Sequence, residues 1–270
     1  MGAVSWRALT YRAGRLEPTD ERVVEEVPLT LVVNGRQLVT LLTLGDHPLE
    51  LAVGFLRSEG LLRGRADLAE WRDEPGSVHL RIDGIGTAME RLFETRTVTT
   101  GCGKGTTFYR TLDALQCRPN ESRARFDPGT VLRRMGELQR RSDLYRETGG
   151  THNASLADGE TTLCFRTDIG RHNAVDMLGG WALLADVVLD RTLLLTTGRI
   201  SSEILVKAVR MGVPAVVSRS APTALALELA RDLGITVVGY ARGAKFNVYT
   251  HPERIEVAET PLDAPGGTDG

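Results

Sequence analysis

Two runs of apolar and β-branched residues near the start of the chain flank a short polar turn. They cover residues 29–33 and 37–44, with Asn34-Gly35 between them. Asn and Gly tolerate the positive φ angles of a two-residue turn, so this pattern predicts an antiparallel hairpin within a β-rich stretch at 21–44.

An amphipathic helix is expected directly after this hairpin. Pro48 suits its first turn, Gly60 supplies a stop, and apolar residues recur at helical spacing at Leu49, Ala52, Val53 and Leu56. Further strands are predicted at 77–82 and 95–100. Residues 1–100 are therefore expected to form a mixed α+β domain, followed at 101–129 by a Cys-bearing loop and a polar linker.

The second half of the chain alternates amphipathic segments with short apolar runs. Helices are predicted at 130–145, 173–185, 202–211 and 223–233, and strands at 152–157, 161–167, 192–197, 215–218, 236–240 and 246–249. Continuous apolar strands between such helices indicate a largely parallel sheet covered on both faces. The expected fold class is α/β, with a three-layer α/β/α sandwich at 130–255 and a disordered tail at 256–270.

Composition narrows the class of protein. The 270 residues are 41% hydrophobic and 25% charged, as in globular proteins, and a net charge of −2 argues against a globally basic nucleic-acid binder. No apolar run approaches ~18 residues, the start lacks a signal-peptide core, and the three cysteines lack zinc-site spacing. These features predict a cytoplasmic protein with reduced thiols, no intrinsic metal, and no nucleic-acid or membrane partner.

Polar loops are expected at the carboxyl ends of the predicted strands, where ligands bind in open α/β sheets. Each carries an arginine, and they cover residues 168–173, 197–202, 218–223 and 240–245. Helix N-termini with arginine bind anions, although Asp, Ser, Thr and Asn at such positions also cap helices. Capping alone explains any single loop better than it explains all four.

The candidate nucleophile is Cys102, which lies among three glycines and two residues from Lys104. Backbone N–H groups and a nearby cation stabilise a thiolate, so a lowered pKa is expected; the alternative is a small residue packed in a tight turn. Cys164 lies in an apolar strand and is expected to pack in the core. Cys117 fits either role.

Three sharper motifs can be compared with this pattern. A phosphate-binding loop requires Ser or Thr directly after Gly-Lys, but Gly105 follows Lys104. The strand and helix order suits a zinc deaminase, but its Glu and its two metal thiols are missing. A hydrolase that pairs Cys102 with His152 or His172 stays open and ranks third.

Several long motifs occur in a fixed order between residues 20 and 255. They include 149–154, 167–176, 197–203, 220–223 and 248–250, with 25–29 and 54–60 before them. With these motifs the chain resembles the FdhD/NarQ family of formate dehydrogenase accessory sulfurtransferases.

This resemblance implies a specific activity. Family members receive sulfur from a cysteine desulfurase as a cysteine persulfide and pass it to the molybdenum bis(molybdopterin guanine dinucleotide) cofactor of formate dehydrogenase. The resemblance also implies a homodimer and a C-terminal domain like a cytidine deaminase without zinc. It maps the persulfide onto Cys102, and the segment that binds the guanine nucleotide onto Tyr240, Ala241, Arg242, Gly243, Ala244 and Lys245.

One residue departs from the family pattern. Many members carry Cys-Gly-x-Cys in the loop, whereas Gly105 stands in place of the second cysteine here. Sulfur capture at Cys102 remains the leading hypothesis, with direct handover of the persulfide. The alternative is a cofactor chaperone that binds the guanine dinucleotide and needs no thiol. The client enzyme, its metal and any role of Cys117 stay open.

Overall fold

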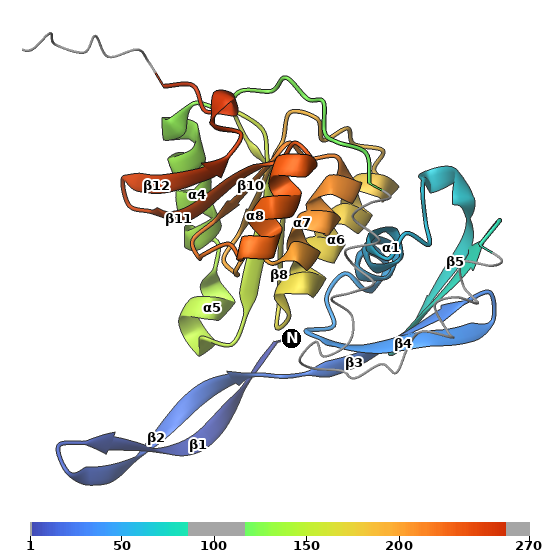
Figure 1. The fold of residues 1–270 in the computed structure, drawn as a ribbon. Coiled ribbons are helices and arrows are strands. Elements are labelled where there is room, and N and C mark those ends of the chain that lie inside the picture. The colour runs from blue at the N-terminus through green and yellow to red at the C-terminus, as the bar shows by residue number, and fades with distance from the viewer. Residues whose placement is uncertain (1, 86–116, 258–270) are drawn as a thin grey trace, which may run out of the picture.

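The computed structural model describes residues 2–85 and 117–257, which form a two-stranded arm and two larger sheets (Figure 1). The predicted strand at 95–100 and the predicted tail from 258 onward lie outside the described residues. In the described ranges, no helix is both long and apolar enough to cross a membrane.

The arm is a hairpin that the sequence did not predict as such. Strand β1 (Ala3–Arg12) pairs with β2 (Arg15–Val24) along its full length, and Ala13 and Gly14 turn the chain with φ angles of 48° and 86°. The arm extends away from the two larger sheets (Figure 1).

A four-stranded sheet follows, with the order β4-β3-β6-β5. The predicted hairpin is confirmed as β3 (Val27–Val33) and β4 (Arg36–Thr43), and both turn residues have positive φ. The predicted helix and one predicted strand are confirmed as α1 (Pro48–Ser58) and β6 (Ser77–Ile82). A short 3₁₀ turn (Arg65–Asp67) and β5 (Leu68–Glu74), which were not predicted, complete this unit.

The second sheet has the order β12-β11-β10-β9-β7-β8. Its strands are β7 (His152–Ala157), β8 (Thr162–Asp168), β9 (Leu193–Thr196), β10 (Ala215–Ser218), β11 (Thr236–Arg242) and β12 (Lys245–Thr250). Parallel pairing joins β9, β10 and β11, whereas β7 and β12 pair antiparallel with their neighbours. The prediction of a largely parallel sheet was therefore wrong at both edges, where short hairpins replace helical crossovers.

Helices cover both faces of this sheet, as predicted. One face packs on α6 (Arg171–Leu184), α7 (Ser202–Met211) and α8 (Ala224–Asp232), and the other on α4 (Pro128–Arg140) (Figure 1). Alternate residues of each strand point to the two sides, so Leu194 and Val216 join the first core while Leu193 and Val217 join the second.

The predicted single helix at 130–145 was wrong. It ends at Arg140, and a separate helix, α5 (Asp143–Thr148), begins after Ser142. The Ser142 hydroxyl donates to the carbonyl of Leu138 at 2.7 Å, and the Ser142 backbone leaves the helical region with ψ of 52°. Serine competes for backbone hydrogen bonds in this way and favours helix ends.

The segment expected to be a linker is held against the C-terminal unit where the structure describes it. Ala124 and Phe126 are buried in the core beside α4. The guanidinium of Arg254, the last residue of a 3₁₀ turn (Pro252–Arg254), donates to the carbonyls of Asn120, Ser122 and Gly234.

The two units meet through α1 and α6 at backbone contact. A Cβ built on Gly54 of α1 lies 1.7 Å from the carbonyl oxygen of Asp176, and one on Gly180 of α6 lies 1.8 Å from that of Glu50. Polar contacts flank this crossing. Lys207 of α7 lies 2.6 Å from the buried Asp176 carboxylate, which also accepts from Ser58 of α1 at 2.5 Å.

Candidate functional site

The four arginine-bearing loops lie at one edge of the second sheet. Strands β8, β9, β10 and β11 run in the same direction, so their carboxyl ends share that edge. The Ser218 hydroxyl donates to the carbonyl of Gly198 at 2.6 Å, and the N–H of Tyr240 donates to the carbonyl of Ser220 at 3.2 Å. The structure thus brings together, along what we term the loop edge, the four loops predicted from the sequence.

Two residues of the first loop brace the fold rather than face a ligand. The Asp168 carboxylate is fully buried and accepts from the Thr43 hydroxyl at 2.7 Å, the Leu44 N–H at 2.9 Å and the Asn173 amide at 2.8 Å. Asn173 also donates to the carbonyl of Leu42 at 2.9 Å. This network ties the end of β4 to the start of α6, so the loop enters the helix in one orientation.

The residues between them, Arg171 and His172, are only partly buried. The His172 Nε2 lies 2.8 Å from the Glu203 carboxylate at the start of α7, within ion-pair distance but without the geometry of a hydrogen bond. Burial, and then the positive charges of Arg171 and His172, lower the pKa of His152 at the start of β7. His152 therefore stays neutral near pH 7 and adds no charge to the loop edge.

Several buried polar atoms at this edge have no hydrogen-bond partner among the described residues. The side chains of Thr151 and Asn153 are 3% and 1% exposed, and their hydroxyl and both amide atoms are unpaired. The same holds for the Nε atoms of Arg171 and Arg219 and the hydroxyl of Ser201. An unpaired buried polar atom costs about 1–3 kcal/mol, so atoms of this kind are normally paired with another protein group, an ordered water or a bound ligand.

In the sequence, only the family motif at 149–154 distinguishes Thr151 and Asn153. The start of β7 reaches the loop edge because β7 runs antiparallel to β8 and β9. Asn153 is locked there by its backbone, whose N–H donates to the Thr197 hydroxyl at 3.1 Å and whose carbonyl accepts from the Thr197 N–H at 3.0 Å. No composition or charge signal marks such residues before the pairing of strands is known.

The segment 240–245 is a strand hairpin rather than the loop that was predicted. Strand β11 continues to Arg242 and β12 begins at Lys245, which leaves only Gly243 and Ala244 as the turn. Ala241 is buried, while Tyr240 is 42% exposed at an irregular position of β11 with φ of 53°. Strands β11 and β12 extend beyond the predicted ranges 236–240 and 246–249 because Arg242 pairs with Lys245 next to the turn.

The exposed ring of Tyr240 lies beside a cation. The guanidinium carbon of Arg242 is 5.9 Å from the ring centroid, and its Nε donates to the carbonyl of Arg219 at 2.9 Å. This bond links the hairpin to the loop after β10. The arrangement offers an aromatic face and a positive charge next to the buried polar atoms.

The predicted nucleophile, Cys102, and Lys104 and Gly105 beside it lie outside the described residues. Cys164 is buried, and burial raises the pKa of its thiol to about 11, which makes it an inert core residue as expected. Cys117 is partly buried and packs against the core beside α6, α7 and α8. In the described ranges, no three His, Cys, Asp or Glu side chains lie close enough to hold a metal ion.

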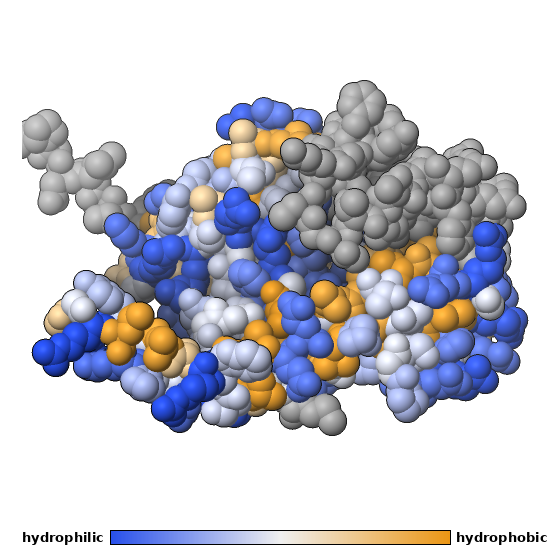
Figure 2. Space-filling view, turned by 90° about the horizontal axis from the view of Figure 1, so that it is seen from below, coloured by the Kyte–Doolittle hydropathy of each residue, from blue (hydrophilic) through white to orange (hydrophobic). Residues whose placement is uncertain are grey.

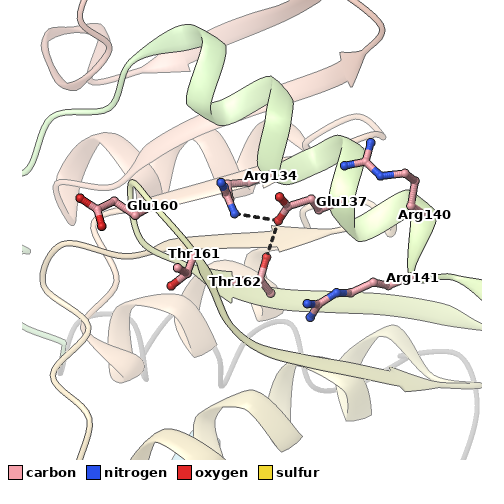
Figure 3. Close-up of a pocket in the computed structure, with 7 residues that line it drawn as sticks. All are labelled: Arg134, Glu137, Arg140, Arg141, Glu160, Thr161 and Thr162. Atoms are coloured by element: carbon pink, nitrogen blue, oxygen red, sulfur yellow. Dashed lines mark hydrogen bonds and ion pairs between the residues drawn. The ribbon is translucent and has the colours of Figure 1, made fainter.

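A pocket of about 450 Å³ lies away from the loop edge, between α4 and the start of β8 (Figure 3). At its centre the Glu137 carboxylate accepts from Arg134 and from the Thr162 hydroxyl, both at 2.8 Å. Arg140 and Arg141 stand at its rim (Figure 3). Because β8 starts at Thr162 and ends at Asp168, this pocket is at the opposite edge of the sheet, and no sequence motif predicted it.

Comparison with known proteins finds related sequences over nearly the whole chain. The FdhD/NarQ family model matches residues 24–256. A protein named sulfur carrier protein FdhD from Bacillus subtilis (strain 168) is 41% identical over 252 residues, which cover 93% of this chain and 95% of that protein. The protein of that name from Bacillus pumilus (strain SAFR-032) is 42% identical over 247 residues, which cover 91% and 94%.

A solved structure shares the fold. The crystal structure of a protein from Desulfotalea psychrophila, described as a formate dehydrogenase accessory protein, matches with a TM-score of 0.79 at 26% identity. The match covers 95% of this chain and 100% of that one, so the arrangement of both units is common to the two proteins.

Proposed function

The chain belongs to the FdhD/NarQ family, and from that premise we propose that it is a sulfur carrier in the maturation of formate dehydrogenase. In this proposal the Cys102 thiolate attacks the outer sulfur of a persulfide on a cysteine desulfurase. The sulfur–sulfur bond of the desulfurase breaks, its thiolate leaves, and a persulfide forms on Cys102. The outer sulfur then passes to the molybdenum bis(molybdopterin guanine dinucleotide) cofactor, which is the substrate. In this step the sulfur–sulfur bond breaks, the Cys102 thiolate leaves, and a reduced form of the cofactor would supply the two electrons that convert the sulfur to sulfide.

The observation that carries this proposal is the set of unpaired buried polar atoms at the loop edge. The dinucleotide cofactor contains pyrophosphate groups, and the Arg171 and Arg219 side chains with the Ser201 hydroxyl offer charge-assisted hydrogen bonds to such an anion. The neutral amide of Asn153 offers both a donor and an acceptor. Binding would satisfy atoms that otherwise destabilise the fold.

The hairpin at the same edge suits the guanine. Tyr240 exposes an aromatic face on which a base stacks, and Arg242 and Lys245 add positive charge. Ala241, Gly243 and Ala244 complete the proposed segment by bringing the chain back along β12. The proposal also includes a cytidine-deaminase-like C-terminal unit without zinc, a homodimer, and a cytoplasmic setting in which thiols stay reduced.

A second candidate function is a cofactor chaperone without sulfur transfer. Gly105 favours it, because the loop lacks the second cysteine through which a persulfide is released as a disulfide. The chaperone requires the loop edge and the hairpin but not Cys102. Substitution of Cys102 therefore distinguishes the two functions.

The experiment loads the protein with sulfur and then tests handover. After incubation with a cysteine desulfurase and cysteine, mass spectrometry is expected to show one added sulfur atom on Cys102 and none on Cys117 or Cys164. Cys102→Ala is expected to bind GDP like the wild type and to lose activation of apo-formate dehydrogenase by at least about 100-fold, since the nucleophile is absent. Cys117→Ala is the matched control and is expected to retain both GDP binding and activation of apo-formate dehydrogenase.

Each of two results contradicts a different part of this proposal. If Cys102→Ala activates formate dehydrogenase fully, the chaperone function holds instead. If Arg171→Ala and Arg219→Ala leave GDP binding unchanged, the loop edge is not the nucleotide site and the observation that carries the proposal fails.

A further inference from the structure

Asn153, the second residue of β7, has hydrogen-bonding groups that the fold does not use. The residue is 1% exposed, yet its amide oxygen and its amide nitrogen both lack a partner among the described residues. The hydroxyl of Thr151, which is 3% exposed, is unpaired as well. Polar groups on the arm differ, because hydrophilic side chains there are interleaved with hydrophobic ones on the open surface, where water solvates them (Figure 2). Asn153 and Thr151 need a partner other than bulk water.

The Asn153 amide is held beside the end of β9. Its N–H donates to the Thr197 hydroxyl at 3.1 Å, and its carbonyl accepts from the Thr197 N–H at 3.0 Å. Ala154 belongs to the core beneath α6, α7 and α8, so the alternation of the strand turns the Asn153 side chain toward the other face of the sheet. The side chain of Arg171 packs on Gly198, where an added Cβ would lie 3.0 Å from two of its carbons. The unpaired groups of Asn153 and Arg171 therefore lie beside the residues that follow β9.

The chemistry of an amide limits the ligand. An asparagine side chain presents one acceptor and one donor in a single plane and carries no net charge. A phosphate offers only acceptors at neutral pH, and an ammonium group offers only donors, so either would leave one amide atom of Asn153 unpaired. A heterocycle with a ring N–H beside a ring carbonyl satisfies both atoms with two hydrogen bonds. Because an unpaired buried polar atom is costly, the heterocycle is the favoured ligand.

The position of Asn153 along the loop edge indicates what such a heterocycle is attached to. Strands β11, β10, β9 and β7 are successive neighbours in the sheet. Adjacent strands lie about 4.8 Å apart, so the strand that carries Tyr240 is about 14 Å from the strand that carries Asn153. Arg219 follows β10 and Ser201 follows β9, between these two strands. A ligand with a ring at each end and phosphate groups in the middle would contact all four residues.

We propose that Asn153 and Thr151 bind the pterin ring of the cofactor. This inference rests on the proposed function and adds the direction in which the substrate lies across the sheet. A molybdopterin guanine dinucleotide carries guanine at one end and a pterin at the other, joined through a pyrophosphate. With the guanine on Tyr240 and the pyrophosphate at Arg219 and Ser201, the pterin lies at Asn153. Its ring N–H donates to the Asn153 amide oxygen, its ring carbonyl accepts from the amide nitrogen, and its amino group donates to the Thr151 hydroxyl.

A binding role for Asn153 predicts a distinctive effect on stability. Replacing a hydrogen-bonded buried asparagine leaves its partners unpaired and destabilises the fold, but the Asn153 side chain has no partner in the described structure. Leucine has nearly the same shape and no polar atoms. Asn153→Leu is therefore expected to leave the midpoint of urea unfolding unchanged or to raise it.

Titration of the full-length protein with two separate probes tests the binding site. The probes are pterin, followed by its own fluorescence, and GDP, followed by calorimetry. The wild type is expected to bind both, and saturating GDP is expected to change the dissociation constant of pterin by less than about threefold, since the two probes occupy opposite ends of the loop edge. Asn153→Leu is expected to raise the dissociation constant of pterin about tenfold or more, because two hydrogen bonds are lost, and that of GDP by less than about threefold.

Two further variants accompany this substitution. Tyr240→Ala is the matched control and is expected to have the reverse effect, with weaker binding of GDP and unchanged binding of pterin. Thr151→Val keeps the shape of the side chain and removes only the hydroxyl. It is expected to raise the dissociation constant of pterin by at least about threefold.

Four results overturn the inference. They are a wild type that does not bind pterin at concentrations up to about 1 mM, an unchanged affinity for pterin in Asn153→Leu, a urea midpoint that this substitution lowers, and displacement of pterin by GDP. Displacement counts because guanine has the same ring N–H and carbonyl, so Asn153 would then bind the guanine. Failure of the proposed function gives a different result. If Tyr240→Ala leaves GDP binding unchanged, the proposed nucleotide site is contradicted, while the effect of Asn153→Leu on pterin is measured independently.

Discussion

Asp168 and Arg171 are three residues apart in one motif, yet their environments differ completely. Asp168 is buried under hydrogen bonds from β4 and α6, whereas Arg171 has an unpaired Nε at the loop edge. The sequence marks the motif as polar and specific, but it cannot divide the motif into a brace and a binding part. That division depends on Thr43 and Leu44, which lie 124 or more residues away in the chain.

Lys207 is a second residue whose structural role the sequence alone does not show. Lysine is rare in this sequence, and Lys207 lies within the helix predicted at 202–211, beside the polar loop at 197–202. In the fold it is buried and paired with Asp176, so it stabilises the packing of α6 and α7 instead of facing the loop edge.

The lowered pKa of His152 predicts a pH-dependent stability. In the unfolded chain this histidine titrates near its ordinary pKa of about 6.5, whereas burial and the charges of Arg171 and His172 depress it in the fold. The unfolded state then binds the proton more readily, so the free energy of unfolding falls as the pH drops through about 6.5 and levels off below the folded pKa. His152→Gln is expected to lessen this fall.

Urea unfolding between pH 8 and pH 5 measures the effect as the difference between the two proteins. That difference is expected to vary with pH in the acidic half of the range and to be constant near pH 8. His79→Gln, on the N-terminal sheet, serves as the control and should keep the wild-type slope. An unchanged slope in His152→Gln would show that the histidine is not desolvated.

Among the elements, those with a periodic and buried pattern were predictable. The bounds of β6, β7, α7 and β10 match the sequence prediction, because their apolar residues all face a core. The arm was not predicted because its apolar residues are exposed and lie on both faces. Its sequence therefore has no periodic pattern of buried positions. The break at Ser142 was missed because it depends on one side-chain hydrogen bond.

The crossing of α1 and α6 predicts a strong steric effect at two glycines. A Cβ at Gly54 or Gly180 would lie within 1.8 Å of a backbone carbonyl oxygen of the other helix, and no rotation of a side chain relieves such a contact. Gly54→Ala and Gly180→Ala are each expected to destabilise the fold by about 3 kcal/mol or more, since the helices must separate. Chemical denaturation of each variant measures this.

Gly136→Ala is the matched helical control. Its added Cβ meets only the end of the flexible Arg140 side chain, at 3.3 Å, within α4. Alanine there is expected to be neutral or to stabilise by up to about 1 kcal/mol, because it lowers the entropy of the unfolded chain. Equal effects at Gly54 and Gly136 would mean that α1 and α6 are not in backbone contact in solution.

At the scale of the whole molecule, the change of pattern near residue 130 predicts two domains. In the structure, contacts distributed along the interface join the two sheets. The Glu50 carboxylate of α1 accepts two hydrogen bonds from Arg166 of β8, at 2.5 and 2.6 Å, while Asp168 holds the end of β4. The Glu50–Arg166 pair and the Asp168 carboxylate are buried or nearly so. Removing one partner of either contact is therefore expected to lower the free energy of unfolding strongly.

These contacts predict that the two units unfold together. Trp71 on β5 reports on the first unit, and Trp181 on α6 reports on the second. In variants that retain only one of these tryptophans, with Trp6 and the other replaced by Phe, the denaturation curves are expected to have the same midpoint, because separating α1 from α6 exposes both cores at once.

Asp168→Ala should lower both midpoints equally, by about 2–4 kcal/mol in free energy of unfolding, since it leaves four donors without their acceptor. The exposed Asp20→Asn on the arm is the control and is expected to change stability by less than about 0.5 kcal/mol. If the Trp71 signal is lost at a lower denaturant concentration than the Trp181 signal, the first unit unfolds independently, and the loop edge then keeps its shape without the brace from β4.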